Sequence, residues 1–556
     1  MKKSVRIVSL VAILVLLLVS VISAGAKPSG TVNVQILALN DFHGNLLPPA
    51  GSSGRVGTID AGGVEYLATH ISNLRALNPN TVVVSAGDMI GASPLLSALF
   101  HDEPTIEAFN LIGLDFNAVG NHEFDEGWDE LVRMQEGGCH PVDGCLDGDD
   151  FAGANFQFLA ANVVRKDNGK TIFPAYKVRS FDTAKIAFIG MTLEGTPLIV
   201  SPSGISALNF LDEADTVNAL IPQLKAKGIE TIVVLIHEGG TQVPSTSPIN
   251  SCTGISGPIV DIVNRFDDEV DVVISGHTHL PYNCIIDNKI VTSAFSFGRL
   301  VTKVDLTINR TTGEVVTMVA DNRIVTRDVP KASLLTALID KYNAIAAPLA
   351  NRIIGSITAT ITRANNLAGE SALGDVIADG QLEATVGQGA VVAFMNPGGI
   401  RTDLNYLSSP AGEGDGNVTY GEMFAVQPFG NSMVTMTLTG AQIETLLEQQ
   451  FAGCGAASDR ILQVSAGFTY TWSASAAACS KVDPTSIMLN GVAIDPTASY
   501  RVTVNSFLAD GGDSFPILTQ GTNRVGGEVD TDAFEAYFAA HSPVPPGPQN
   551  RITRIP

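Results

Sequence analysis

The sequence is short of positive charge, and this shortage limits the partners that the protein can bind. It contains 33 lysines and arginines against 56 aspartates and glutamates, which gives a formal net charge of -23. Because a nucleic-acid-binding surface needs an excess of basic side chains, we expect no nucleic-acid partner. If the substrate is an anion, the positive charge that holds it must be local, from metal ions or from a few arginines.

Cysteine is also scarce, and its spacing argues against a thiolate metal site. The chain has six cysteines and no CxxC pair, so zinc binding by cysteine is the weaker interpretation. Disulfides are the stronger one, and pairs that are close in the chain are favoured. The favoured pairs are Cys139 with Cys145, Cys252 with Cys284, and Cys454 with Cys479.

Beyond residue 26 the chain lacks any stretch that is long and apolar enough to span a bilayer. Residues 1–26 differ, because a basic start precedes an apolar run at residues 8–22 and a small-residue site, Ala24-Gly25-Ala26. This order is typical of a secretory signal peptide; an uncleaved anchor is the alternative, and the small-residue site argues against it. We therefore expect a secreted or periplasmic protein with no stable membrane anchor after cleavage.

The length of 556 residues is too great for one hydrophobic core, and two or more domains are expected. Residues 330–352 begin with a proline and are amphipathic, with no group of catalytic residue types. We predict that this helix joins a first domain, residues 27–329, to a second, residues 353–556. Residues 135–157 are rich in glycine and aspartate without the spacing of a calcium loop, and are predicted to be a solvated loop with His140 on its surface.

Polar motifs follow the apolar runs of the first domain. Strands are predicted at residues 32–39, 81–86, 231–236 and 270–275, and a short apolar run covers residues 116–119. Five of the nine histidines lie where these runs end: His43, His122, His237, His277 and His279. Each alone would be read as a structural imidazole or part of a polar turn. Their common position after strands is hard to credit to chance.

Together these strand ends carry a mixed set of oxygen and nitrogen ligands without a thiolate. The set consists of Asp41, His43, Asp88, Asn121, His237, His277 and His279. It suits two borderline or hard divalent cations, such as Zn, Mn, Fe or Co, with Asp88 as the natural bridge, although Asp88 could instead cap a helix. Two-metal sites serve phosphoryl hydrolysis by activating water. Asp125 can orient His122, which can then stabilise the transition state or assist the leaving oxygen.

The second half of the chain carries glycine-rich turns with aromatic or charged neighbours. Strands are predicted at residues 354–361 and 391–395, and the second runs into Asn396-Pro397-Gly398-Gly399-Ile400-Arg401. Glycines allow close backbone approach to a ligand, and an arginine suits phosphate; a plain turn with a surface arginine is equally compatible with the pattern. Phe429 and Phe507 stand beside polar turns, where they can pack in a core or stack on a planar base.

The motifs DxH, GD, GNHE, H and GHxH, in this order and each after a strand, resemble those of calcineurin-like metallophosphoesterases. The motifs NPGGIR, QPFGN and FLADGGDSF resemble the C-terminal domain of the exported 5'-nucleotidase family. The resemblance covers nearly the whole mature chain. It implies an N-terminal four-layer α/β/β/α metallophosphoesterase sandwich and a separate α/β C-terminal substrate-binding domain.

The resemblance also implies roles for individual residues. One metal would be bound by Asp41, His43, Asp88 and His279, and the other by Asp88, Asn121, His237 and His277. His122 and Asp125 would form the catalytic dyad. On the substrate side, Arg401 would hold phosphate, Asn396 and Gly399 would contact the substrate, Phe429 and Phe507 would enclose the base, and Asp513 would contact the nucleoside. Members often place more than one arginine before the helix predicted at residues 370–384, where this chain offers only Arg363.

The resulting expectation is a secreted, metal-dependent 5'-nucleotidase that hydrolyses nucleoside 5'-monophosphates to nucleoside and phosphate. A UDP-sugar hydrolase or nucleotide pyrophosphatase, or a 2',3'-cyclic-nucleotide phosphodiesterase, is the alternative on the same scaffold. A nucleotide- or metal-binding protein without turnover is a third reading. The intact His122–Asp125 pair argues against that reading, because binding alone does not need it. The expected partner is a small nucleotide, and the sequence gives no indication of the oligomeric state.

Overall fold

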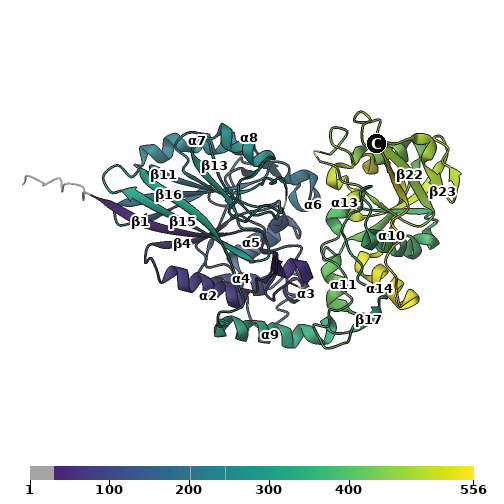
Figure 1. Ribbon diagram of the computed structural model, residues 1–556, viewed down its shortest axis with the longest axis horizontal. Helices are drawn as coiled ribbons and strands as arrows, with labels where there is room; N and C mark the ends of the chain where they lie inside the picture. The colour runs from purple at the N-terminus through teal and green to yellow at the C-terminus, as the bar shows by residue number, and fades with distance from the viewer. Residues whose placement is uncertain (1–29, 50, 201, 245, 457) are drawn as a thin grey trace, which may run out of the picture.

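The chain folds into two α/β domains joined by one long helix. The structure, a computed structural model, describes residues 30–556 except residues 50, 201, 245 and 457, so the predicted signal peptide lies outside the described residues. In Figure 1 the N-terminal domain runs from purple to teal and the C-terminal domain from green to yellow, and helix α9 (Ser333–Ala350) runs along the lower side of the N-terminal domain toward the C-terminal domain. No helix of the described part combines the length and the apolar character needed to cross a membrane.

The first sheet of the N-terminal domain has six strands in the order β16-β15-β1-β4-β5-β6. Its strands are β1 (Thr31–Leu39), β4 (Thr81–Ser85), β5 (Phe116–Ala118), β6 (Gln157–Leu159), β15 (Leu300–Asn309) and β16 (Val315–Ile324). The first four are parallel; β15 pairs antiparallel with β1, and β16 pairs antiparallel with β15. Helices α2 (Val64–Arg75), α4 (Glu103–Ile112) and α5 (Trp128–Glu136) cover one face through a shared apolar core.

The second sheet also has six strands, in the order β13-β14-β12-β11-β9-β8. They are β8 (Tyr176–Phe181), β9 (Ala184–Thr192), β11 (Thr231–His237), β12 (Val272–Ser275), β13 (Tyr282–Ile286) and β14 (Lys289–Ser293). Helices α7 (Glu213–Ala226) and α8 (Pro258–Arg265) pack on its outer face. A third core, which includes Ile36, Val84 and Phe188, fills the space between the two sheets. The predicted four-layer α/β/β/α sandwich is therefore confirmed.

The alternation of side chains along the buried strands explains the layers. Val83 of β4 faces the helices, whereas Val82 and Val84 face the other sheet. A strand that is apolar on both faces can be stable only between two covering layers. Because β1, β4 and β5 are parallel, as are β11 and β12, the polar residues that follow each strand are delivered to one edge of each sheet.

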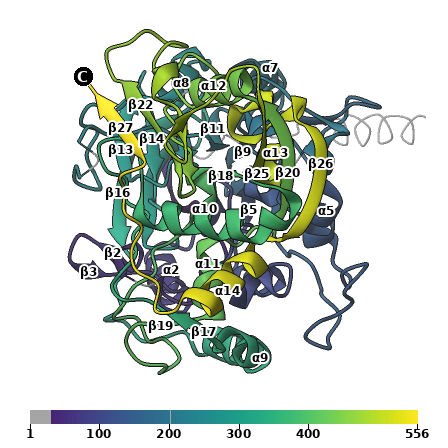
Figure 2. The same cartoon turned by 90° about the vertical axis from the view of Figure 1, so that its right-hand side faces the viewer.

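The C-terminal domain is built on a five-stranded sheet in the order β21-β18-β25-β20-β26. Its strands are β18 (Val392–Met395), β20 (Ser432–Thr439), β21 (Gln463–Val464), β25 (Ser499–Asn505) and β26 (Thr522–Val529). Helix α10 (Ala372–Thr385) packs against β18 and β25 and beside α14 (Asp530–His541), as Figure 2 shows. Helix α12 (Gly440–Gln449) contributes Ile443 and Leu446 to the core on this sheet.

The predicted strand at residues 354–361 is longer than the strand that forms. Strand β17 covers Ile353–Ser356 and pairs with β19 (Asn417–Thr419). Beyond it the backbone leaves this partner, because Ile357 bridges to Val544 and Ile361 bridges to Leu404. The apolar run is therefore shared among three partners rather than one sheet.

All three favoured disulfides are present: Cys139–Cys145, Cys252–Cys284 and Cys454–Cys479. The first closes a small loop within the predicted solvated insertion. One prediction for that insertion is wrong, because the side chain of Asp147 is only 2% exposed. It accepts hydrogen bonds from Lys341 Nζ (2.6 Å) and Tyr342 Oη (3.0 Å) and so ties the insertion to α9.

Candidate active site

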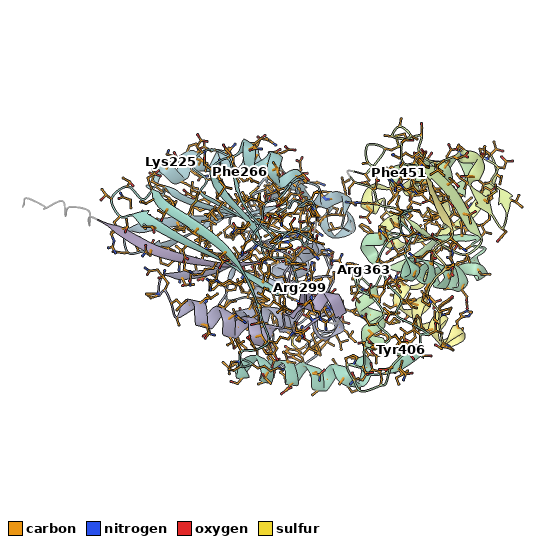
Figure 3. All side chains as sticks on the ribbon, viewed as in Figure 1. Lys225, Phe266, Arg299, Arg363, Tyr406 and Phe451 are labelled. Carbon is orange, nitrogen blue, oxygen red and sulfur yellow. A yellow bond between two sulfur atoms is a disulfide. The ribbon has the colours of Figure 1, made fainter. Side chains whose placement is uncertain are left out.

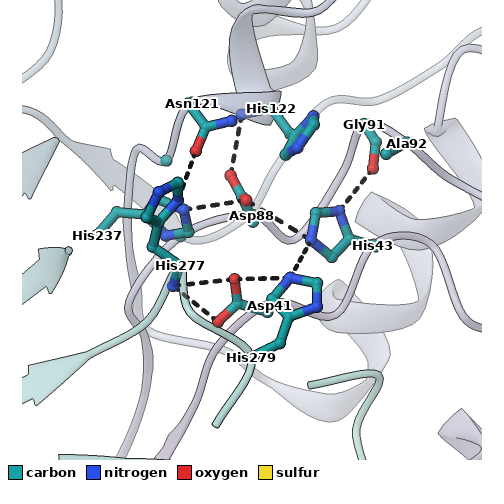
Figure 4. A network of polar contacts seen from close by, with 12 residues as sticks. Asp41, His43, Asp88, Gly91, Ala92, Asn121, His122, His237, His277 and His279 are labelled. Atoms are coloured by element: carbon teal, nitrogen blue, oxygen red, sulfur yellow. Dashed lines mark hydrogen bonds and ion pairs between the residues drawn. The ribbon is translucent and has the colours of Figure 1, made fainter. Parts of the chain in front are cut away.

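Seven polar side chains converge where five strands of the N-terminal domain end (Figure 4). Asp41 and His43 follow β1, Asp88 follows β4, Asn121 follows β5, His237 ends β11, and His277 and His279 follow β12. Five of them have left-handed backbone conformations: Asp41, His43, Asp88, His277 and His279, with φ between 47° and 70°. Such conformations are uncommon for residues with a Cβ atom and gather at functional sites.

The first group of side chains consists of Asp41, His43 and His279, whose ligand atoms all lie within 4.8 Å of one another. His279 Nε2 is 3.3 Å from Asp41 Oδ1 and 3.0 Å from His43 Nε2. Asp41 itself is fixed, because the backbone N–H of His277 donates to both of its carboxylate oxygens at 3.0 Å.

The second group consists of Asp88, His237 and His277, which also lie within 4.8 Å of one another. Oδ2 of Asp88 is 2.9 Å from His237 Nε2 and 3.5 Å from Nε2 of His43, which belongs to the first group. Asp88 therefore stands between the two groups. Asn121 joins the second one, with its Oδ1 3.1 Å from His277 Nδ1.

The hydrogen bonds of two histidines show that the set suits cations. His43 Nδ1 faces the Gly91 carbonyl and His237 Nδ1 faces the Ala86 carbonyl, each at 2.8 Å. A carbonyl only accepts, so each Nδ1 donates and, in the neutral ring, Nε2 presents a lone pair. Buried His237 Nε2 has no hydrogen-bond partner among the described residues, although it lies 2.9 Å from Asp88 Oδ2. A cation would satisfy these converging lone pairs and carboxylates.

The charge state of Asp88 fits a bridging role. Burial disfavours the ionised carboxylate, but His237 and His122, when protonated, outweigh burial and hold the pKa of Asp88 well below its usual range. Bound cations would supply this positive charge in place of the protons. Oδ1 of this carboxylate also accepts the backbone N–H of His122 at 2.9 Å. Asp88 is thus an oriented anion between the two histidine groups.

His122 and Asp125 form the predicted pair. Nδ1 of His122 lies 2.9 Å and 3.1 Å from the two carboxylate oxygens of Asp125. The backbone N–H of Ala92 donates to Asp125 Oδ2 at 3.1 Å and holds the carboxylate in place. Burial opposes protonation of the imidazole, but Asp125 and Asp88 outweigh it and raise the pKa of His122. The pair can therefore hold a proton on the imidazole, as a general acid requires.

Glu123 is a residue of the GNHE motif to which sequence reasoning gave no role. Its buried carboxylate accepts the backbone N–H groups of Asp88 (2.9 Å), Met89 (2.9 Å) and Gly120 (2.6 Å). It thereby fastens the loop after β4 to the loop after β5. The signal in the sequence was the motif itself, because a glutamate three residues after a loop glycine can reach back to that backbone.

The C-terminal domain completes a cavity of about 370 Å³ over these residues. From the N-terminal domain the lining includes Asn121, His122, Asp125 and His277, and from the C-terminal domain Asn396, Gly399, Arg401, Phe429, Phe507 and Asp513. The ring of Phe429 stacks beside that of His122, with centroids 5.8 Å apart, and the Arg401 guanidinium lies 5.7 Å from the Phe429 ring. The structure thus brings the predicted dyad and all but one of the predicted substrate residues to one cavity.

Arg363 is the exception. It lies on the side of the C-terminal domain that faces the N-terminal domain (Figure 3), but it is not part of the cavity lining. Its Nη1 donates to the Ile400 carbonyl at 2.9 Å, directly before Arg401. Burial and then the charge of Arg363 lower the pKa of Arg401. Arg363 therefore holds the loop that carries Arg401 through this hydrogen bond, and its charge affects the pKa of Arg401.

Arg460 and Asn431 line the cavity and were not predicted. Arg460 Nη1 donates to Asp513 Oδ1 at 2.6 Å, and Asn396 Nδ2 donates to the other oxygen of Asp513 at 2.7 Å. Asn431 belongs to the QPFGN motif, but nothing in the sequence around Arg460 distinguishes it from a surface arginine. Only the fold brings it to Asp513, 53 residues later in the chain.

Comparisons with known proteins agree with this architecture. Residues 34–281 match the family model described as calcineurin-like phosphoesterase, and residues 353–520 match the model described as 5'-nucleotidase, C-terminal domain. The crystal structure of a 5'-nucleotidase precursor from Thermus thermophilus is similar, with a TM-score of 0.76 and 26% identity; the match covers 94% of this chain and 99% of that one.

Two curated relatives are more similar to this chain in sequence than the Thermus thermophilus protein is. Endonuclease YhcR of Bacillus subtilis (strain 168) is 33% identical over 530 residues, which is 93% of this chain but 41% of the relative, so this chain spans less than half of its length. Cell wall protein Lmo0130 of Listeria monocytogenes serovar 1/2a is 31% identical over 536 residues, 91% of this chain and 67% of the relative.

Calcineurin-like phosphoesterases bind two metal ions, and the two side-chain groups around Asp88 are candidate sites for them. The order of the two matched regions along the chain is the order of the two folded domains. On these grounds the chain belongs to the 5'-nucleotidase family, as a hydrolase with a metallophosphoesterase domain followed by a 5'-nucleotidase C-terminal domain.

Proposed function

We propose that the protein hydrolyses nucleoside 5'-monophosphates to nucleoside and phosphate. The observation that carries this proposal is the shared cavity, in which the dyad lies on one wall with Asn121 and His277 of the second ligand group, and the residues proposed to bind phosphate and base form the other wall. A cavity that ends in oxygen and nitrogen ligands at one side and aromatic rings at the other fits a molecule with one phosphoryl end and one planar end.

The C-terminal wall would hold the substrate. Arg401 offers a planar fork of donors for the phosphoryl oxygens. Phe429 and Phe507 line the cavity and would stack on the base. Asp513, held by Arg460 and Asn396, would accept hydrogen bonds from nucleoside hydroxyl groups. With the phosphate and the base held in this way, the ester bond would point toward the dyad.

The N-terminal wall would carry out the hydrolysis. When bound, two divalent cations such as Zn, Mn, Fe or Co supply Lewis-acid activation of water and of the phosphoryl oxygens. Asp41, His43 and His279 would hold one cation, Asn121, His237 and His277 the other, and Asp88 would contact both. Because Nδ1 of His122 is bonded to Asp125, Nε2 is the nitrogen that would face the substrate and donate a proton to the leaving oxygen.

We further propose that the protein acts outside the cytoplasm on free nucleotides. Three disulfides fit an oxidising compartment, and the similar cell wall protein fits an exported chain. The net charge of -23 gives no basis for binding an extended nucleic acid, although one relative is named an endonuclease. A small-molecule substrate is therefore the proposed partner.

A second candidate activity rests on a separate cavity of about 210 Å³ that also uses Arg401. Its lining includes Gly44, Pro48, Phe297 and Asp403, on the side of His43. A phosphoryl group at Arg401 could then carry one substituent in each cavity. This arrangement favours, as the alternative, a UDP-sugar hydrolase or nucleotide pyrophosphatase, or a 2',3'-cyclic-nucleotide phosphodiesterase.

Hydrolysis of AMP, UDP-glucose, ADP and 2',3'-cyclic AMP tests the proposal, with the products separated by chromatography as well as assayed for free phosphate, because cleavage of UDP-glucose or of the cyclic nucleotide yields phosphomonoesters rather than phosphate. The purified mature chain would be assayed with added Mn²⁺ or Zn²⁺, with a chelator, and as the H122A variant. We expect chelator-sensitive release from AMP that falls by at least about 100-fold in H122A. Cleavage of UDP-glucose or the cyclic nucleotide without comparable AMP hydrolysis would favour the second candidate. Bound metal without turnover of any substrate would favour a non-catalytic binding protein.

A further inference from the structure

We propose that a third divalent cation, of the Zn²⁺ type, binds outside the cavity at a cluster formed by His101, Glu126 and His140. The three residues come from separate segments: the turn before α4, the residue after Asp125, and the disulfide-closed loop 139–145. One ligand atom from each lies within 4.8 Å of the other two. None of the three lines either interdomain cavity.

Hydrogen bonds already hold the cluster together. His101 Nδ1 is 2.7 Å from Glu126 Oε2, and His101 Nε2 is 3.1 Å from Asp143 Oδ2. His140 Nδ1 is 3.2 Å from the same Asp143 oxygen. Asp143 therefore contacts both imidazoles and can orient the ring of His101, whose Nε2 can donate to it, as a carboxylate behind a metal-binding histidine does.

The ligand types suit a borderline cation. Two imidazoles and one carboxylate match the nitrogen and oxygen ligands that Zn²⁺ accepts, with water in the remaining position. The backbone N–H of Asp143 donates to Nδ1 of His140 at 3.1 Å, so this nitrogen is unprotonated, and it can bind a cation only after giving up that hydrogen bond. The chain's net charge of -23 adds a general attraction for cations.

Binding requires one local rearrangement. The rings of His101 and His140 are stacked, with centroids 3.8 Å apart and planes 15° apart. Lone pairs in two parallel planes cannot point at one ion, so one ring must turn about its side-chain bonds. His140 is the ring that can turn, because Pro141, Val142 and Asp143 of its loop are exposed. Glu126 is exposed as well and can follow the ion.

The surroundings limit the entropic cost of assembling the ligands. The Cys139–Cys145 disulfide closes the loop that carries His140, and Asp147 fastens the following residues to Lys341 and Tyr342 of α9. A restrained loop loses less conformational entropy when its side chains take a fixed geometry. A bound cation would tie this loop to Glu126 and hence to the segment that carries Asp125.

The ordinary alternative is an ion-pair cluster that holds a proton in place of a metal ion. Contact with Glu126, set against burial, raises the pKa of His101, so a protonated imidazole between two carboxylates would also account for the contacts. The two readings differ in stoichiometry. A proton cluster adds no Zn²⁺ to the chain, whereas a metal site adds one per molecule.

Zinc counting on matched variants tests the proposal. The mature full-length chain would be stripped with a chelator, dialysed against Zn²⁺ and assayed for bound metal. We expect the wild type to bind about one Zn²⁺ per chain more than H140A, and the affinity of that site to fall at least 10-fold in the variant. H541A is the control, because His541 also pairs with a carboxylate, Glu383, but lies in the C-terminal domain, away from the cluster.

The outcomes separate this proposal from the proposed function. Equal zinc in the wild type and H140A would overturn the third site, whatever the activity. Loss of AMP hydrolysis in H122A with the extra zinc retained would leave the third site standing. H140A is expected to hydrolyse AMP within about twofold of the wild type, since His140 touches neither the dyad nor the cavity. If H140A does not fold, E126Q removes the exposed carboxylate ligand, and an unchanged zinc count there also overturns the site.

Discussion

At the residue scale, the site is defined as much by backbone conformation as by side-chain chemistry. Asp41, His43 and Asp88 all have φ near 50°, which turns each side chain back over the end of its strand. A residue with a Cβ atom pays on the order of 1 kcal/mol for such a conformation, so surrounding contacts must offset the cost. The buried carboxylate of Glu123 is one such contact, because it accepts the N–H of Asp88 itself.

Replacing Glu123 with glutamine tests this support. The amide would place a donor against one of the backbone N–H groups that the carboxylate now accepts. We expect metal affinity to fall by about 10- to 100-fold, because an outer residue that orients ligands typically has an effect of this size. Equilibrium dialysis with metal analysis measures it. E136Q, at an exposed position of α5, serves as the control, and unchanged affinity in E123Q would show that the loop orders itself without the carboxylate.

Arg460 offers a second test at this scale, which rests on the proposed function. Its contact with Asp513 orients the group that would bind the nucleoside, far from the dyad. We expect R460A to raise KM for AMP by about 10-fold, as loss of a charge-assisted hydrogen bond implies, and to keep kcat within about threefold. Steady-state kinetics provide the measurement, with R165A, an exposed ion-pair variant, alongside. A fall in kcat with unchanged KM would place Arg460 in the chemical step.

At the scale of elements, strand periodicity predicted most of the framework. The apolar runs at residues 32–39, 81–86, 231–236 and 270–275 correspond to β1, β4, β11 and β12, and the polar motifs after them meet at the site. The prediction of a single strand at residues 354–361 was wrong, because apolar character alone does not say how many partners a segment has. The prediction that residues 135–157 form a solvated loop was wrong at Asp147 for a related reason. The partners of Asp147 on α9 lie almost two hundred residues away in the chain.

The start of β12 carries a pH-dependent feature of the sheet. Asp271 Oδ2 accepts the N–H of Ile232 in the neighbouring strand at 2.9 Å. Burial, with added repulsion from Glu314 and Glu269, raises its pKa from 3.8 to about 7. Between these two values the folded chain retains a proton that the unfolded chain has lost. The free energy of unfolding therefore falls as pH rises through this window.

An asparagine at this position should remove the pH-dependent loss. The amide oxygen can still accept the N–H of Ile232 and never ionises. Relative to the wild type, D271N should gain on the order of 2–4 kcal/mol of stability between pH 4 and pH 8. Urea unfolding at pH 4.5, 6 and 8 measures the difference, and D261N, an exposed change on α8, is the control. A constant difference between D271N and the wild type across these pH values would contradict the prediction.

At the scale of the whole molecule, the active cavity exists only because two domains meet. The two domains also touch where η3 (Thr196–Leu198) meets η7 (Gly512–Ser514), and Ile199 and Val200, next to η3, line the cavity with Asp513. Phe429 lies against His122 in this arrangement. We therefore expect the exchange of substrate and product at this cavity to depend on how closely the two domains approach each other.

A reversible cross-link between the domains tests whether they move during turnover. One cysteine would be introduced into η3 and one into η7. We expect the oxidised double variant to lose at least 10-fold in turnover of AMP and to regain it after mild reduction, because exchange of substrate and product requires an open cleft. Each single-cysteine variant and the wild type, treated in parallel, control for effects on the native disulfides. Full activity of the cross-linked chain would show that the cleft admits substrate without domain motion.

The sequence by itself determined the ligand chemistry and the main strands of the N-terminal domain, whereas the four-layer order was implied by the resemblance to a known family. Residue types at strand ends indicated a site with oxygen and nitrogen ligands, and periodic apolar runs indicated strands buried on both faces. Both are local properties, because a strand and the loop that follows it are set within about ten residues. Local pairing was also enough for the three disulfides.

The tertiary structure alone decided which distant groups meet. It placed Arg460 on Asp513, turned Arg363 onto the carbonyl before Arg401, and stacked His140 on His101. It also set the domains face to face, so that the ring of Phe429 lies over the dyad histidine. Such contacts depend on how two independently folded cores pack and on paths of loops with no periodic signal. The free energy that selects them is spread over many weak contacts across the molecule, and no single stretch of sequence carries it.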